Sequence, residues 1–232
     1  MNPWIVKARS LVRRTGAIRL INHLINRLLP PNTYGQRAHH ALTAALRPGD
    51  AVWDVGANVG LYSEMFCRHV GPDGLVVAFE PFAESCAAIR ERLPDCAWLR
   101  VENVALGDAD TIGRLLTWGD SAENNIATEA DASDHETVSV PVEIRRGDTM
   151  CSRLGRIPNF IKVDVEGFEE EVLLGMGDLL GSPQLRCVVV EVHFMKLEAR
   201  GQPMAPVRIE KLLRARGFKA TWLGASQLFA VR

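Results

Sequence analysis

The chain has 232 residues, a formal net charge of −1, 47% hydrophobic residues and 24% charged residues. These values are typical of a globular α/β domain and exclude a wholly disordered chain, a collagen-like chain and a coiled coil. The charge is uneven, because residues 1–49 carry +8 with no acidic side chain, which leaves −9 (−1 minus +8) on residues 50–232. This division predicts a separate role for the N-terminal segment.

Residues 1–49 are expected to form a basic helical accessory segment beside a main domain at 50–232. Apolar side chains recur near helical spacing over Ile18–Leu29, and Pro30 follows, which indicates an amphipathic helix. We favour a helix that packs on the domain with its arginines in solvent. The alternative is that residues 1–30 contact a membrane surface or an acidic partner.

Cysteine content and hydropathy limit the cellular environment. The five cysteines form no C-x-x-C pair, so the sequence indicates neither a disulfide framework nor a structural zinc site. No run of about 18 apolar residues predicts a membrane-spanning helix. We therefore expect a protein of a reducing, cytoplasmic compartment.

From Asp50 onward, short apolar runs alternate with segments of helical periodicity. Strands are expected at Ala51–Val55, Leu75–Phe79, Trp98–Leu106, Phe160–Val165, Leu185–Val192, Lys219–Leu223 and Gln227–Val231. Helices are expected at Val59–Val70, Ala83–Leu93, Glu169–Met176 and Val207–Arg216. This alternation predicts a parallel sheet covered by helices on both faces. The last two strands are joined too tightly for a crossover, so one of them must be antiparallel.

Residues 107–150 interrupt the alternation and are expected to form strands without helices. Val138, Val140, Val142 and Ile144 alternate with less apolar residues, which is typical of a strand with one exposed face. A polar loop over residues 119–125 precedes that strand. The pattern predicts a β insertion between strands three and four.

A glycine-containing turn follows the first expected strand. Asp54 lies near the end of this strand, and Gly56 and Gly60 open the next helix. Glycines allow a sharp turn and close approach of a ligand, toward which the helix N–H groups point. The dinucleotide fingerprint G-x-G-x-x-G has a glycine where this chain has Asn58, which disfavours a nicotinamide oxidoreductase. A plain strand-to-helix turn remains the alternative.

Glu80 follows the second expected strand, where a carboxylate can accept hydrogen bonds from both ribose hydroxyls of a nucleoside. A solvated glutamate is the alternative, but the glycine turn before it favours binding. The small and apolar residues between Asn103 and Asp108, which include Ala105, are suited to flank an adenine ring.

Together these segments resemble the FkbM family of S-adenosylmethionine-dependent methyltransferases. The resemblance rests on Asp54–Gly60 (DVGANVG), Phe79–Pro81 (FEP), Asn103–Asp108 (NVALGD), Ile161–Glu169 (IKVDVEGFE), Val172–Gly175 (VLLG) and Glu191–His193 (EVH). It implies a class I methyltransferase (Rossmann-like) fold, with a seven-stranded, mostly parallel sheet whose last strand is antiparallel. It also implies that S-adenosylmethionine is bound by Asp54, Gly56, Asn58, Gly60, Glu80, Asn103 and Ala105.

The fourth and fifth expected strands end near polar residues that would face the methyl group. Methyl transfer needs an aligned nucleophile and a base for its proton. His193 is the candidate base, because its ordinary pKa is near neutrality, and Asp164 or Glu166 would orient it or bind the acceptor hydroxyl. As structural alternatives, Glu166 caps a helix, His193 has no chemical role and Lys162 pairs with a neighbouring carboxylate.

A metal is a separate hypothesis, which the sequence leaves open. Asp164 and Glu191 are expected on adjacent strand ends, where Mg²⁺ can be held by one or two carboxylates and waters. No third ligand is evident in the sequence.

The expected function is O-methylation of a small molecule, such as a sugar, a polyketide or a lipid. A nucleic-acid methyltransferase that binds phosphates through the basic N-terminus is the alternative. This chain lacks the Asn/Asp-Pro-Pro-Tyr/Phe motif of base amino methylation, so no nucleic-acid partner is expected. A non-catalytic cofactor-binding protein is disfavoured, because it has no need for the polar strand ends. The acceptor and the oligomeric state remain open.

Overall fold

A computed structural model describes residues 40–117, 125–127 and 138–232 of the chain. Predictions for Ile18–Leu29 and for residues 119–124 lie outside this range. The strands of the large sheet are β1 (Ala51–Val55), β2 (Leu75–Phe79), β3 (Leu99–Glu102), β8 (Phe160–Val163), β9 (Cys187–Glu191), β10 (Lys219–Leu223) and β11 (Gln227–Val231). The helices are α4 (Leu61–Val70), α5 (Ala83–Arg92), α6 (Gly147–Leu154), α7 (Glu169–Gly175), α8 (Phe194–Ala199) and α9 (Ala205–Ala215), with a 3₁₀ turn at Gly177–Gly181.

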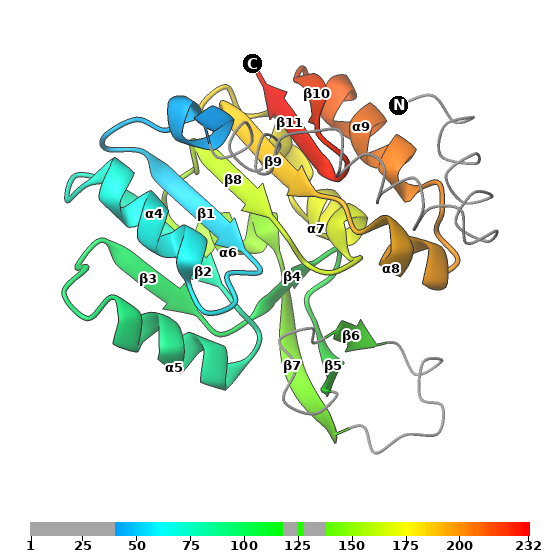
Figure 1. Cartoon of the computed structure of the whole chain (residues 1–232), viewed down its shortest axis with the longest axis horizontal. Helices are drawn as coiled ribbons and strands as arrows, with labels where there is room; N and C mark the ends of the chain where they lie inside the picture. Colours follow the sequence, from blue (N-terminus) through cyan, green and yellow to red (C-terminus); the bar gives the residue numbers. More distant parts are fainter. Residues whose placement is uncertain (1–39, 118–124, 128–137) are drawn as a thin grey trace, which may run out of the picture.

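The large sheet has seven strands in the order β10-β11-β9-β8-β1-β2-β3 (Figure 1). β11 is antiparallel to both of its neighbours, while β1, β2, β3, β8 and β9 pair in parallel. The predicted seven-stranded sheet with an antiparallel last strand is therefore confirmed. The strand order reverses beside β1, and in such open sheets ligands bind near that point at the carboxyl ends of the strands.

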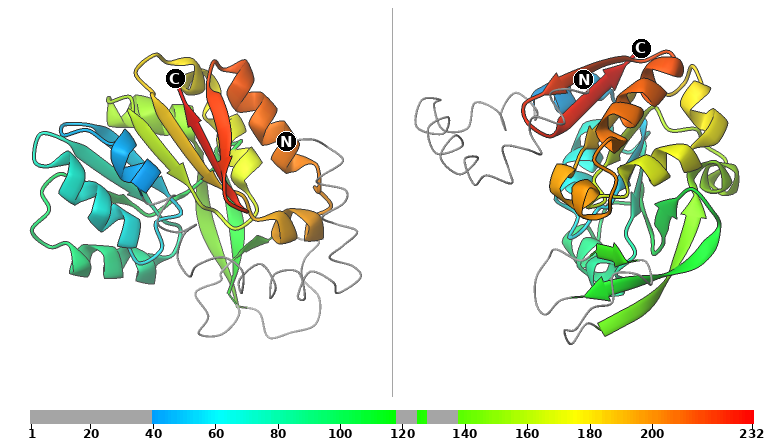
Figure 2. Two further views of the ribbon diagram at one scale, coloured as in Figure 1. Left: turned by 45° about the horizontal axis from the view of Figure 1, so that its top comes forward. Right: turned by 90° about the vertical axis from the view of Figure 1, so that its right-hand side faces the viewer.

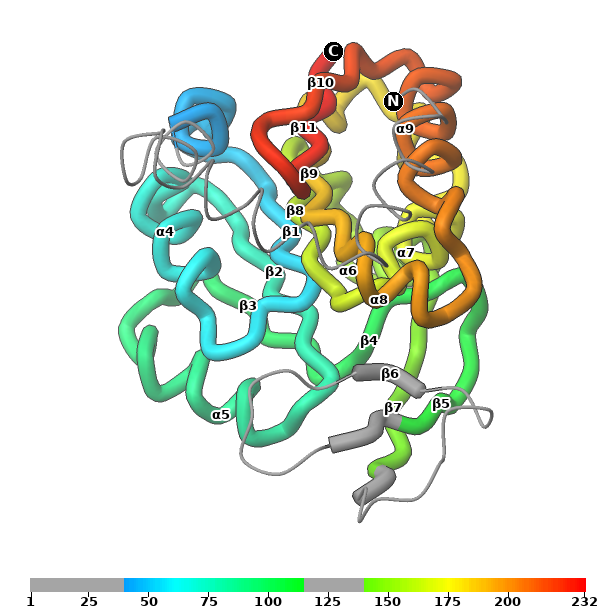
Figure 3. The backbone as a smooth tube through the Cα atoms, turned by 45° about the vertical axis from the view of Figure 1, so that its right-hand side comes forward, coloured from blue at the N-terminus to red at the C-terminus, as the bar shows by residue number. Residues whose placement is uncertain are grey.

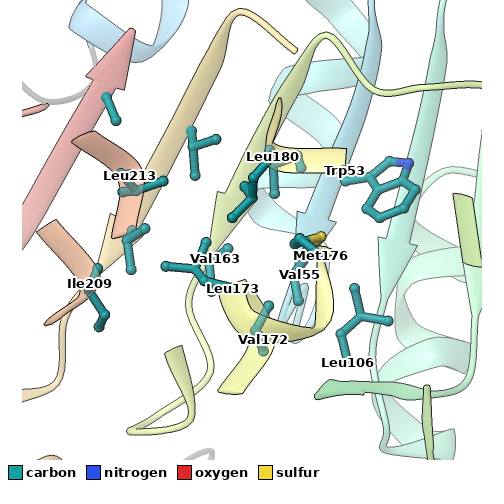
Figure 4. Close-up of a cluster of buried hydrophobic side chains, with 14 of the residues drawn as sticks. Trp53, Val55, Leu106, Val163, Val172, Leu173, Met176, Leu180, Ile209 and Leu213 are labelled. Carbon is teal, nitrogen blue, oxygen red and sulfur yellow. The ribbon is translucent and has the colours of Figure 1, made fainter. Parts of the chain in front are cut away.

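Helices cover both faces of this sheet, as the alternation predicts. Trp53 and Val55 face one side, where they pack with residues of α6, α7 and α9 (Figure 4). Val52 and Val76 face the other side, where they pack with α4 and with a short helix at 40–45. The right-hand view of Figure 2 shows α4 and α7 on opposite sides of the sheet.

A second, four-stranded sheet contains the predicted β insertion. Its strands are β4 (Ala105–Gly107), β5 (Thr111–Thr117), β6 (Asn125–Ala127) and β7 (Val138–Arg146), in the order β4-β7-β5-β6. Figures 1 and 3 place this sheet beyond the end of the large sheet toward which β1 and β8 point. It is therefore on the same side of the molecule as the carboxyl ends of the parallel strands.

Two predictions about this region are wrong. The single strand expected at Trp98–Leu106 is divided between β3 and β4, because the chain leaves the large sheet at Asn103 and β4 pairs with β7. α7 packs closely on the end of β4, since a Cβ on Gly175 would lie 1.8 Å from the carbonyl oxygen of Gly107. The expected absence of helices fails at α6, where Met150 is buried against the large sheet.

Within the residues that the structure describes, no helix is both long enough and apolar enough to cross a bilayer.

Candidate active site

A buried carboxylate and a buried ammonium lie side by side on neighbouring strands at the candidate site. Asp54 of β1 stands directly opposite Lys162 of β8 in the parallel register. Asp54 is fully buried, and its Oδ2 accepts a hydrogen bond of 2.7 Å from Ser63 Oγ of α4. Its Oδ1 lies 3.8 Å from Lys162 Nζ and has no hydrogen-bond partner among the described residues. Burial raises the pKa of Asp54, and Lys162 and Ser63 lower it only in part.

The glycine turn closes tightly over the next strand ends. Gly56 has a φ of 80°, and a Cβ there would lie 1.9 Å from the carbonyl oxygen of Asp164. Only glycine permits this approach of the turn after β1 to the turn after β8. Gly60, with a φ of 82°, precedes α4 and donates its N–H to the Ala57 carbonyl at 2.9 Å. The predicted glycine turn is therefore present, and its backbone lies against the turn that follows β8.

Glu80 is held at the end of β2 by backbone amides. Asn58 N donates to its Oε2 at 2.8 Å, and Phe82 N donates to its Oε1 at 3.0 Å. Burial raises the pKa of Glu80, against the lowering effect of these two N–H groups. Each carboxylate oxygen can accept a second hydrogen bond. The pair of acceptors matches the two adjacent hydroxyls of a ribose.

Asn103 and Ala105 complete the predicted donor-binding set. Asn103 Nδ2 donates to the carbonyl oxygens of Glu80 at 3.0 Å and Pro81 at 2.9 Å, and so ties the end of β3 to that of β2. Ala105 is buried in β4. The structure thus gathers Asp54, Gly56, Asn58, Gly60, Glu80, Asn103 and Ala105 around the ends of the first three strands of the chain.

The predicted catalytic residues form a second cluster beyond β8 and β9. Asp164, Glu166 and His193 each offer a ligand atom, and these atoms lie within 4.8 Å of one another. His193 Nε2 is 3.6 Å from Asp164 Oδ1 and 3.4 Å from Glu166 Oε2. Glu166, in the turn after β8, has a φ of 53°. This left-handed backbone conformation is uncommon for residues other than glycine. Two turns distant in sequence from the glycine turn, one after β8 and one after β9, thus meet beside it.

His193 has a partner that the sequence reasoning missed. Its Nδ1 lies 2.8 Å from Oε1 of Glu169, whose side chain is fully buried. Burial lowers the pKa of His193, but Glu169, Glu166 and Asp164 together raise it to about 9. The ring is therefore an imidazolium at neutral pH, and the ordinary pKa used in the sequence argument does not apply. No spacing signal distinguishes Glu169 from Glu170 and Glu171, which follow it.

Lys162 connects the two clusters. Its Nζ lies 3.0 Å from Asp164 Oδ2, so the expected pairing with a neighbouring carboxylate is confirmed. Its ammonium also lies 4.2 Å from the centre of the Tyr62 ring. Asp54 and Asp164 raise the pKa of Lys162 against the effect of its burial. The donor-binding candidate Asp54 and the catalytic candidate Asp164 therefore share one buried cation.

The arrangement of possible metal ligands differs from the pair suggested by the sequence. Among the described residues, the group with suitable spacing is Asp164, Glu166 and His193, and Glu191 is not part of it. A histidine nitrogen with two carboxylates is a donor set that several divalent cations accept.

Comparison with known proteins identifies relatives of the chain. The model of the methyltransferase FkbM domain matches residues 54–220. The chain is 32% identical to the 31-O-demethyl-FK506 methyltransferase FkbM of Streptomyces tacrolimicus, over 75% of this chain and 74% of that protein. It is 28% identical to the hexuronic acid methyltransferase AglP of Haloferax volcanii, over 62% of this chain and 56% of that one.

Solved structures give the same fold at much lower identity. Fibrillarin from Aeropyrum pernix, crystallised with natively bound S-adenosyl-L-methionine, superposes with a TM-score of 0.50 at 12% identity. The match covers 80% of this chain and 67% of fibrillarin. At this identity the likeness concerns the fold alone, which agrees with the class I methyltransferase architecture of the large sheet.

Proposed function

Because this chain belongs to the FkbM family of S-adenosylmethionine-dependent methyltransferases, we propose that it methylates a hydroxyl group of a small molecule. The observation that carries the proposal is the cluster of Asp164, Glu166 and His193 beside the donor-binding strand ends. It offers hydrogen-bond acceptors and a titratable ring where an acceptor hydroxyl must meet the methyl group. Two relatives support a small-molecule acceptor, since their names specify 31-O-demethyl-FK506 and a hexuronic acid.

The residues at the ends of β1, β2 and β3 fit the donor. Asp54 Oδ1 is a buried acceptor without a hydrogen bond in the described structure and lies 3.8 Å from Lys162 Nζ, and the charged form of this side chain would attract a cationic ligand. Glu80 would hold the ribose hydroxyls, Gly56, Asn58 and Gly60 the methionine part, and Asn103 and Ala105 would flank the adenine. When bound, S-adenosylmethionine supplies a methyl group on a sulfonium, which needs no acid to leave.

We assign removal of the acceptor's hydroxyl proton to the cluster of Asp164, Glu166 and His193. Asp164 or Glu166 accepts the hydrogen bond of the acceptor hydroxyl, and the neutral form of His193 removes its proton. With a pKa of about 9, roughly one ring in a hundred is neutral at pH 7. A base of this strength has a larger driving force toward an alcohol proton, which offsets the small population. Turnover is therefore expected to rise as the pH increases toward about 9.

Methyl transfer from an isotopically labelled donor tests the proposal. The purified full chain is incubated with a hydroxylated macrolide, a uronic acid and amine analogues of both. Mass spectrometry and NMR then locate the labelled methyl on oxygen or nitrogen. His193→Gln and Glu166→Gln are expected to lower kcat while donor affinity stays within about twofold, since neither side chain lies in the donor-binding set. Methylation confined to nitrogen would overturn the O-methyl assignment.

Metal dependence is a separate, secondary proposal that rests on the donor set of Asp164, Glu166 and His193. A divalent cation there would lower the pKa of an acceptor hydroxyl and replace the histidine as the means of activation. Loss of activity in EDTA with recovery in Mg²⁺ or Mn²⁺ would support it. Full activity in EDTA would remove it and leave His193 as the base.

For residues 1–49, which precede the matched family domain, we propose a role in shaping the acceptor site. Deletion of residues 1–30 separates the alternatives. Reduced acceptor affinity with intact donor binding supports this role, whereas lost binding to anionic vesicles with normal turnover supports a membrane contact. Salt-sensitive binding to RNA would instead favour the alternative of a nucleic-acid methyltransferase.

A further inference from the structure

We propose that Lys162 is a positioning residue that keeps Asp54 ionised for donor binding and couples it to Asp164 of the catalytic cluster. The proposal deepens the function proposed above and rests on the donor pocket of that function. Lys162 touches neither the donor nor the acceptor in this scheme. It acts through the two carboxylates between which it lies.

The ammonium of Lys162 is enclosed by two carboxylates and an aromatic ring. Only about 5% of the Lys162 side chain is exposed, and its Nζ lies 3.0 Å from Asp164 Oδ2 and 3.8 Å from Asp54 Oδ1. The Tyr62 ring covers it at 4.2 Å. Since Asp54 and Lys162 are register partners on β1 and β8, backbone pairing places their Cα atoms side by side. The ammonium itself is enclosed by the two carboxylates and the Tyr62 ring.

Burial makes ionisation of the Asp54 carboxylate unfavourable. Asp54 is wholly buried, so its charged form is disfavoured unless opposite charge or hydrogen bonds compensate. Ser63 satisfies one oxygen with a hydrogen bond. The other oxygen has no hydrogen bond in the described structure and faces the ammonium of Lys162. A charged Asp54 would attract a cationic methyl donor more strongly than its neutral form, so donor affinity should depend on the ammonium of Lys162.

Several charged and titratable groups surround Asp54. Besides Lys162, the titratable groups that interact electrostatically with Asp54 include Asp164 after β8, Glu80 after β2, and Tyr62 and Cys67 of α4. Glu191 of β9 in turn acts on Tyr62. Asp164 disfavours ionisation of Asp54, whereas Lys162 favours it. Removal of one or the other should therefore shift the pH dependence of donor binding in opposite directions.

Calorimetric titration with S-adenosylmethionine, without acceptor, between about pH 5 and 9 tests the proposal. In the wild type, affinity should fall as the pH drops through the raised pKa of Asp54. Lys162→Met should move that midpoint upward by about 1–3 pH units, because the compensating charge is lost. Asp164→Asn should move it downward, and Lys162→Arg should leave it close to the wild-type value.

Two further variants identify the titrating group and the control. Lys162→Met combined with Asp54→Asn should bind weakly at every pH, without the shifted midpoint. Lys211→Met, which removes an exposed lysine of α9, should not change the midpoint. A folded Lys162→Met variant with the wild-type midpoint would overturn the proposal. An Asp164→Asn midpoint that does not move downward would contradict the coupling of Asp54 to Asp164.

If Lys162→Met does not fold, the Asp164→Asn and Lys162→Arg midpoints still decide, since Asp164 is partly exposed and its replacement conserves size. The readout is independent of the acceptor. Nitrogen methylation would therefore overturn the proposed function and leave this inference standing, and unshifted midpoints would do the reverse.

Discussion

Nδ1 of His193 lies 2.8 Å from Oε1 of Glu169, which is completely buried at the start of α7. The other ring nitrogen faces Asp164 and Glu166 at 3.6 and 3.4 Å. A histidine between three carboxylates is stabilised as an imidazolium, and its pKa is raised to about 9. The residue is thus a strong but mostly protonated base at neutral pH.

Replacing Glu169 by Gln should lower the pKa of His193. The amide oxygen can still accept the Nδ1–H hydrogen bond, but the negative charge is lost, so we expect a decrease of roughly 1–2 units. NMR titration of the His193 ring measures the shift directly, and the rising limb of the kcat profile should move to lower pH with it. Glu84→Gln, an exposed change on α5, is the control. A His193 pKa that is unaffected by Glu169→Gln would contradict the assignment.

The raised pKa of His193 also predicts how stability depends on pH. Because the folded-state pKa of about 9 exceeds the ordinary 6.5, the stabilisation is complete below about pH 6.5 and is lost as the pH rises through about 9. After a discount for partial solvent exposure, the loss is on the order of 1–2 kcal/mol. Urea unfolding at pH 6 and pH 9.5, compared with His193→Gln, measures it. Equal pH dependence in both proteins would exclude His193 as its source.

Glu80→Gln should weaken S-adenosylmethionine binding by about tenfold or more. The amide has one acceptor oxygen where the carboxylate has two, so one backbone N–H or one ribose hydroxyl loses its partner. Calorimetry of donor binding gives the affinity, and thermal unfolding verifies that the turn after β2 is intact. Glu91→Gln, also exposed on α5, is the matched control. Wild-type affinity in a folded Glu80→Gln protein would remove Glu80 from the donor site.

Gly56→Ala should destabilise the protein much more than Gly155→Ala. Both glycines have a positive φ, so both changes cost about 1–2 kcal/mol of backbone strain. A Cβ at Gly155 meets nothing within 4 Å, whereas at Gly56 it would lie 1.9 Å from the Asp164 carbonyl oxygen. The additional overlap should bring the loss to roughly 3 kcal/mol or more. Similar unfolding free energies for the two variants would show that the turns after β1 and β8 are not in contact.

The grouping of the donor-binding candidates at one sheet edge could be predicted from sequence because these residues follow directly after apolar strands. Asp54, the glycine turn and Glu80 lie within a few residues of the ends of β1 and β2. The carboxyl ends of parallel strands meet at one edge of a sheet, so adjacency along the chain is enough to predict proximity in space. That one of the last two strands is antiparallel followed from the short connection between β10 and β11, and the family resemblance implied that it is the last one.

Other features depend on contacts between distant segments, and only the tertiary structure decided them. Glu169, Glu170 and Glu171 are equivalent in sequence, yet the rotation of α7 directs them to His193, Arg208 and Arg200, respectively. The third expected strand is divided because β4 pairs with β7, a segment distant in the sequence, instead of continuing the large sheet.

The charge state of the site belongs to this second group. The unequal charge of the chain, and its acidic main domain, can be read from the sequence. The pKa of His193 and the sharing of Lys162 between Asp54 and Asp164 cannot, because they depend on distances of a few ångströms between β1, β8, β9 and α7. Sequence thus determined which groups are present at the sheet edge, and folding determined which of them carry charge.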